Sequence, residues 1–132
     1  MRFIKGTPGQ GLFFPAANNL ALTTYCDSDH AGCPTARRST TGYCIFLGGS
    51  LVSWKSKKQS NVAKSTAEAE YRAMATTCLE IIWLRYILDD LKVIQDKPTM
   101  LHCDNEAALH IVANPVFHKR TKHIEIDCHI VR

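Results

Sequence analysis

Three acidic residues stand at positions where carboxylates could do chemistry. Asp27 ends the β-patterned run LALTTYCD (residues 20–27), and Asp104 directly follows a second such run, TMLHC (residues 99–103). Glu70 lies in the first turns of a long helical segment. If the two runs are parallel neighbours in one sheet, their carboxyl ends bring both aspartates together, and a helix crossing the sheet adds Glu70 to the same place.

Converging carboxylates of this kind are typical of a metal site. Like charges repel unless cations neutralise them, and ligation by oxygen alone selects hard cations such as Mg²⁺ or Mn²⁺. Such clusters hold two ions roughly 3.5–4 Å apart, which activate water and stabilise the leaving oxygen in phosphodiester cleavage. Aspartates at strand ends are also common turn formers, so both interpretations are open on spacing alone.

The elements that would position these residues follow from periodicity and turn signals. Gly48-Gly49-Ser50 predicts a tight turn between two hairpin strands, and a strand reached through a helix is parallel to a neighbour. We therefore expect an α/β fold with a mixed sheet, built from a three-strand meander plus a parallel fourth strand. The expected elements are strands at 20–27, 41–47 and 51–57, a helix from about 65 to 91, a strand at 99–103, and helices at 106–113 and from 121 onward.

The long helix has a clear start. Ser65 and Glu68 fit a capping box, in which each side chain satisfies the other residue's backbone amide. Trp54 and Trp83 are interpreted as core or strand-face aromatics. Helical spacing predicts an apolar face made of Tyr71, Met74, Ala75, Cys78, Ile82 and Tyr86.

Basic residues dominate the middle of the chain. No acidic residue occurs between His30 and Ala67, although the net charge of the whole chain is only +4. A segment of one sign in a nearly neutral chain indicates a surface that faces a polyanion, with an ordinary solvated face as the alternative. The residues concerned are Arg37, Arg38, Lys55, Lys57, Lys58 and Lys64.

Length and composition limit the class of protein. A chain of 132 residues with 45% hydrophobic residues accommodates one globular domain. No apolar run approaches the roughly 20 residues of a membrane span, and the amino terminus lacks a secretion signal. The six cysteines include no CxxC pair, so reduced thiols are expected rather than disulfides. The composition predicts an intracellular protein, cytoplasmic or nuclear, that is neither secreted nor membrane-bound.

Five stretches of the chain carry specific motifs, namely YCDSDHAGC, RRSTTGYCIFLGGSLVSWKSKKQ, STAEAEYRAM, LHCDNEAAL and FHKRTKHIEIDCHIVR. Together they resemble a known family, the ribonuclease H domain of copia-type LTR retrotransposon Pol polyproteins. The opening MRFIKGTPGQGLFF is similar to the segment that joins reverse transcriptase to that domain. The resemblance therefore divides the chain into a remnant of this connection (1–19) and a ribonuclease H-like domain (20–132).

The resemblance assigns roles to the three carboxylates. It places the catalytic, metal-binding residues at Asp27, Glu70 and Asp104, with Asp29 as a rival for the first, and implies two Mg²⁺ or Mn²⁺ ions in a complete domain. The implied activity is cleavage of the RNA strand of RNA–DNA hybrids during retrotransposon replication. The implied partners are the hybrid, held by the basic segment, and the reverse transcriptase of the same polyprotein.

The chain also departs from the family pattern. Ribonucleases of this fold use a fourth carboxylate on a helix that follows a fifth strand. The resemblance places both elements after the segment that ends at Arg132, so we expect this chain to be a truncated domain that lacks them. Glu125 and Asp127 are interpreted as surface carboxylates. A catalytically inactive relic or nucleic-acid-binding fragment of the same fold is therefore the alternative function, and an interaction module with an exposed sheet edge is a second.

A zinc site is a further alternative for the histidines and cysteines. His30 and Cys33, with His118 and His123, could supply zinc ligands, but zinc sites normally draw closely spaced pairs from tight knuckles. The two later histidines fit a polar loop near phosphate better. Cys103 is interpreted as buried strand packing, because no partner base for a nucleophile is evident.

Overall fold

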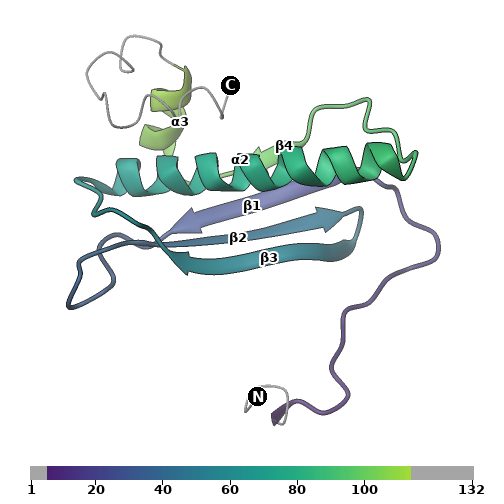
Figure 1. Ribbon diagram of the computed structural model, residues 1–132, viewed down its shortest axis with the longest axis horizontal. Helices are drawn as coiled ribbons and strands as arrows, with labels where there is room; N and C mark the ends of the chain where they lie inside the picture. Colours follow the sequence, from purple (N-terminus) through teal and green to yellow (C-terminus); the bar gives the residue numbers. More distant parts are fainter. Residues whose placement is uncertain (1–5, 114–132) are drawn as a thin grey trace.

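The computed structural model describes residues 6–113 of the chain (Figure 1). Every element expected in this range is present, close to its predicted boundaries, and the helix expected from residue 121 lies outside the described residues. The elements are β1 (Leu22–Ser28), β2 (Thr40–Leu47), β3 (Ser50–Lys58), α2 (Thr66–Asp90), β4 (Met100–His102) and α3 (Glu106–Ala113).

The four strands form one mixed sheet in the order β3-β2-β1-β4. β2 pairs antiparallel with both β1 and β3, and β4 pairs parallel with β1, which confirms the predicted meander and parallel fourth strand. A bulge between Ile45 and Phe46 shifts the register of β2 against β3. Within the described chain, β3 and β4 form the two edges of the sheet.

The turn between β2 and β3 depends on a glycine. Gly48 has φ +59°, and a Cβ atom at this position would collide with the side chain of Asn18. The Asn18 amide donates a hydrogen bond to Leu47 O (2.9 Å) and accepts one from the Gly49 amide (3.0 Å). The lead-in segment before β1 is therefore anchored on the hairpin turn.

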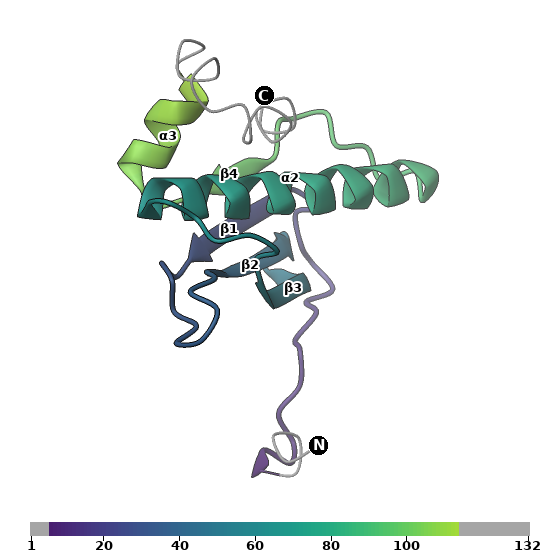
Figure 2. The same cartoon turned by 60° about the vertical axis from the view of Figure 1, so that its left-hand side comes forward.

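Helix α2 covers one face of the sheet, as Figures 1 and 2 show. Its buried side chains Met74, Ile81 and Leu88 pack with Cys26 of β1 and Ile45 of β2 in one core cluster. In Figure 1 the arrowhead of β1 lies at the same end of the molecule as the first turns of α2 and as α3. This end carries the candidate site. Among the described residues, no helix is both long and apolar enough to cross a membrane.

The start of α2 differs in one detail from the predicted capping box. The Ser65 hydroxyl accepts the Glu68 amide (3.2 Å), as expected. The Glu68 carboxylate, however, accepts the amide of Lys64 (2.9 Å) rather than that of Ser65. The other carboxylate oxygen of Glu68 pairs with the Arg72 guanidinium at 2.9 Å. The Glu68 side chain therefore caps the amide one residue before the predicted position and also forms an ion pair within the helix.

The predicted apolar face was wrong in the second half of α2. Ile82 and Tyr86 are 41% and 69% exposed, whereas Ile81 and Leu88 are buried. A straight helix advances 3.6 residues per turn, so the face that begins at Met74 reaches Ile81 and Leu88 after two and four turns. The apolar residues at 82 and 86 lie to one side of that line.

Candidate functional site

Asp27 and Asp104 lie at the same end of the sheet, where the parallel strands β1 and β4 both finish. β1 and β4 pair in parallel register, and their last pair is Tyr25 with His102. Each aspartate follows its strand's member of that pair by two residues. Both side chains are exposed, so the carboxyl ends of β1 and β4 present them together, as the parallel arrangement predicts.

Glu70 completes the acidic group from above the sheet. It lies in the second turn of α2 and is only 3% exposed. Burial, chiefly, and the nearby carboxylates of Asp27 and Asp104 together raise the pKa of Glu70 to about 7, against the opposing effect of a hydrogen bond from the Ser28 backbone amide. The structure therefore brings all three predicted carboxylates close enough for Asp27 and Asp104 to act on Glu70, although Asp27 is not part of the group whose donor atoms all lie within 4.8 Å of one another.

A thiol belongs to the same place. One donor atom each from Glu70, Cys103 and Asp104 lie within 4.8 Å of one another. The Cys103 Sγ lies 3.9 Å from Glu70 Oε2. Cys103 packs against the core cluster, which confirms the predicted strand packing, and its half-buried side chain also points toward the carboxylates. Its position directly before Asp104 was the signal that could have identified it.

The rival aspartate has another use. Asp29 follows the end of β1, and its carboxylate accepts the backbone amide of Thr40 across the loop. The Cβ position of Gly32 is also filled by this side chain. Asp29 therefore holds the loop between β1 and β2, while Asp27 faces the Glu70 carboxyl group.

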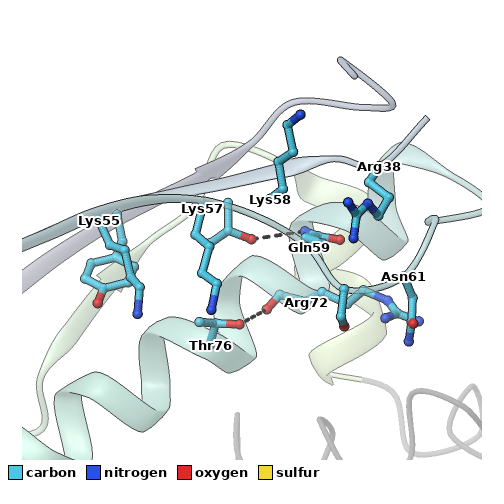
Figure 3. A pocket seen from close by; sticks show the side chains of 11 residues that line it. Arg38, Lys55, Lys57, Lys58, Gln59, Asn61, Arg72 and Thr76 are labelled. Carbon is cyan, nitrogen blue, oxygen red and sulfur yellow. Dashed lines mark hydrogen bonds between the residues drawn. The ribbon is translucent and has the colours of Figure 1, made fainter. Parts of the chain in front are cut away.

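A groove of about 580 Å³ opens between β3 and the first half of α2 (Figure 3), and none of the three carboxylates lines it. In Figure 3 Lys55 and Lys57 point toward α2, and Lys58 points away from it. The residues that line the groove are Arg38, Thr41, Tyr43, Lys55, Lys57, Lys58, Gln59, Ser60, Asn61, Arg72 and Thr76.

Four of the six predicted basic residues thus gather at the groove, and two do not. Arg37 lies in the loop before β2 with φ +52°, and Lys64 is exposed just before α2. Lys58 is partly committed elsewhere, because its Nζ donates to the Cys33 Sγ at 3.2 Å. Arg72, which sequence reasoning missed, lines the groove and pairs with Glu68.

A buried glutamine joins the groove to the acidic group. The Gln59 Nε2 lies within hydrogen-bond distance of Ser28 Oγ (3.2 Å), Thr41 Oγ1 (3.1 Å) and Ala69 O (2.8 Å). Ser28 and Ala69 are the chain neighbours of Asp27 and Glu70. Gln59 therefore fixes β1, β2 and α2 relative to one another at the point where two of the carboxylates emerge.

The remaining cysteines of the described residues form no further group of possible metal ligands. All five cysteines within residues 6–113 are free thiols, as expected. Hydrogen bonds from the Ala36 backbone, the Thr35 hydroxyl and Lys58 lower the pKa of Cys33 to about 6. The zinc interpretation cannot be assembled from the described part, since His118 and His123 lie outside it, as do Glu125 and Asp127.

The two tryptophans lie at the surface. Trp54 and Trp83 are 61% and 55% exposed. Trp54 is the strand-face aromatic that was expected, at a position of β3 paired with Cys44. Trp83 lies on the outer side of α2, so the interpretation of this residue as core was wrong.

Comparison with known proteins finds relatives over the whole chain. The chain is 44% and 43% identical to retrovirus-related Pol polyproteins from transposons RE1 and RE2 of Arabidopsis thaliana, in each case over all 132 residues. It is 40% identical to the corresponding polyprotein from transposon TNT 1-94 of Nicotiana tabacum, again over 132 residues. The chain is related over its whole length to one segment of the retrovirus-related Pol polyproteins of transposons.

This Pol segment spans about a tenth of the length of those relatives, 9–10% of each. Their names describe the polyprotein and not the part of it that is matched. No family model matches the chain, and no solved structure matches it. The mixed sheet, with its antiparallel meander and parallel β4, agrees with the expected ribonuclease H-like fold. The names of these relatives therefore do not identify the reaction of this Pol segment.

Proposed function

We propose that this Pol segment is a metal-dependent ribonuclease H, which cleaves the RNA strand of RNA–DNA hybrids during retrotransposon replication. The observation that carries the proposal is the position of Glu70. A carboxyl group that is 3% exposed and coupled to two further carboxylates is costly for a fold to maintain without a counter-charge. A divalent cation supplies that counter-charge.

The chemistry of the donor set fits magnesium or manganese. Asp27, Glu70 and Asp104 offer carboxylate oxygens, which these hard cations prefer. The three residues would hold the ions between the ends of β1 and β4 and the start of α2. Bound ions of this kind would activate water for attack on a phosphodiester and stabilise the leaving oxygen. The leaving oxygen would become the 3′-hydroxyl of one RNA product.

The groove supports a nucleic-acid substrate. Lys55 and Lys57 extend across it toward α2, and Arg38 lines it near Gln59. Gln59 lines the groove and also contacts Ser28 and Ala69, the chain neighbours of Asp27 and Glu70, so a hybrid whose backbone is held in the groove would extend from there toward the carboxylates. Lysine contacts with phosphate do not distinguish one base or one type of duplex from another. Discrimination of the RNA–DNA hybrid from a DNA duplex would therefore come from its A-form-like geometry and from contacts with 2′-hydroxyl groups.

The proposal is tested with matched substrates. The purified chain is incubated with an end-labelled RNA–DNA hybrid, the same sequence as DNA duplex, and the same sequence as RNA duplex, each with Mg²⁺, with Mn²⁺ and with EDTA. We expect metal-dependent cleavage of the RNA strand in the hybrid alone. Binding of the hybrid without cleavage in either metal would instead favour the inactive nucleic-acid-binding fragment.

A further inference from the structure

A thiol lies among the donor atoms of the acidic group. Donor atoms of Glu70, Cys103 and Asp104 lie within 4.8 Å of one another, and the Cys103 thiol donates a hydrogen bond to Glu70 Oε2 at 3.9 Å. The three side chains come from two directions, since Glu70 descends from α2 and the other two end the β4 segment. Atoms spaced in this way surround one point that a single cation can occupy.

The neighbouring thiol is a less suitable donor. Cys26 on β1 is only 6% exposed and belongs to the hydrophobic core cluster. The closest donor group includes Cys103 and leaves out Cys26. Cys103 also adjoins Asp104 in the chain, so one short segment supplies both a sulfur and an oxygen ligand.

A mixed set of two carboxylates and one thiolate does not select magnesium. Mg²⁺ takes oxygen ligands in near-ideal octahedral geometry, whereas thiolate sulfur favours zinc and other softer divalent ions. Zn²⁺ accepts both Cys sulfur and Asp or Glu oxygen as ligands, and three protein ligands with one open position are a common arrangement for it. The donor atoms therefore allow a second mode of metal binding besides the all-carboxylate one.

We propose that Glu70, Cys103 and Asp104 bind a thiophilic divalent cation of the Zn²⁺ class, with the Cys103 sulfur as a direct ligand. On binding, the thiol proton is released to solvent and a metal–thiolate bond forms. Because Glu70 and Asp104 also belong to the proposed magnesium site, the bound ion displaces Mg²⁺ and inhibits hydrolysis. Only this last consequence rests on the proposed function, since the binding itself does not require activity.

The test uses Cd²⁺ as a spectroscopic probe, since a cadmium–thiolate bond gives a charge-transfer absorption band in the ultraviolet. Replacing Cys33, Cys44 and Cys128 by Ser and Cys78 by Ala in one parent variant removes every thiol outside the cluster except Cys26. Titration of the parent with Cd²⁺ is expected to give one saturable band at one equivalent. Cys103→Ser in this parent should abolish the band, and Cys26→Ala should retain it.

Asp104→Asn provides the second arm. Loss of a residue that only hydrogen-bonds to a metal ligand weakens metal binding by about 10–100-fold. Loss of Asp104 as a direct ligand should therefore weaken Cd²⁺ binding by more than about tenfold, while the absorption band remains. Circular dichroism of each metal-free variant shows whether it is folded, and Cys103→Ala replaces Cys103→Ser if the latter is not. An unchanged band and affinity after loss of Cys103 would overturn the proposal. Absence of hybrid cleavage together with a Cys103-dependent band would overturn the proposed function and leave this site intact.

Discussion

Asp27 and Asp104 occupy equivalent places on two parallel strands, each two residues beyond the Tyr25–His102 pair. The register of β1 against β4 therefore determines how close the two carboxylates lie. A shift by one residue would move one side chain to the other face of the sheet. Gln59 contributes to the position of Glu70, because it contacts both Ser28 at the end of β1 and Ala69 in the first turn of α2.

Stability should depend on pH through Glu70. Burial first, and then Asp27 and Asp104, raise its pKa from 4.5 to about 7 in the native state. Between these values the native state holds a proton that the unfolded state has released, so the free energy of unfolding falls as pH rises. The expected loss without metal is on the order of 1–3 kcal/mol, measured by urea unfolding. Glu70→Gln should remove this part of the pH dependence, and an identical pH profile in the variant would contradict the argument.

Asp104→Asn should separate metal binding from folding. Removing one carboxylate relieves repulsion on Glu70, so the metal-free variant should unfold at the same temperature as the wild type or higher. Mg²⁺ or Mn²⁺ should raise the melting temperature of the wild type and leave that of the variant nearly unchanged. Equal metal-induced shifts in both proteins would exclude Asp104 from the site.

The groove lysines should control the salt dependence of hybrid binding. Replacing Lys55 and Lys57 by Gln should reduce the slope of log K against log salt by about 0.7–0.9 for each phosphate that is no longer neutralised. Lys58→Gln should reduce it less, because that side chain points away and is held by Cys33. Lys92→Gln and Lys97→Gln, placed after the far end of α2, serve as charge-matched controls. An unchanged slope in the Lys55/Lys57 variant would place the substrate elsewhere.

The buried contacts of Gln59 should contribute measurably to the free energy of unfolding. Gln59→Ala leaves the buried Ser28 and Thr41 hydroxyls and the Ala69 carbonyl without this partner, at an expected cost of about 1–3 kcal/mol. Urea unfolding measures the loss. Gln95→Ala, which removes a single exposed bond to the Leu20 carbonyl, should cost clearly less, and similar costs for the two would show that Gln59 does not hold the elements together.

The fold was largely predictable because its signals are local. Alternation in the strands, the turn around Gly48 and the Ser65 cap each depend on a few neighbouring residues. The parallel pairing of β4 followed from the helix before it. The buried face of α2 beyond Met74 was less predictable, because neighbouring apolar residues such as Ile81 and Ile82 fit the helical period about equally well.

The site was predictable only in part, for a physical reason. Asp27 and Asp104 were found because strand ends in a parallel pair meet at one edge. The role of Gln59 depends on contacts with β1, β2 and α2, which no sequence spacing encodes. Cys103 gave a local signal beside Asp104, but a cysteine at the end of a strand is more often core packing.

Cleavage of a labelled RNA–DNA hybrid by single-carboxylate variants tests the central claim most directly. Rates are measured in Mg²⁺ for the wild type, Glu70→Gln and the control Asp89→Asn, which changes an exposed carboxylate at the far end of the same helix. The account predicts RNA-strand cleavage by the wild type and by Asp89→Asn, and a loss of at least about a hundredfold for Glu70→Gln, as for loss of a principal catalytic group. Cleavage by Glu70→Gln at the wild-type rate would contradict it.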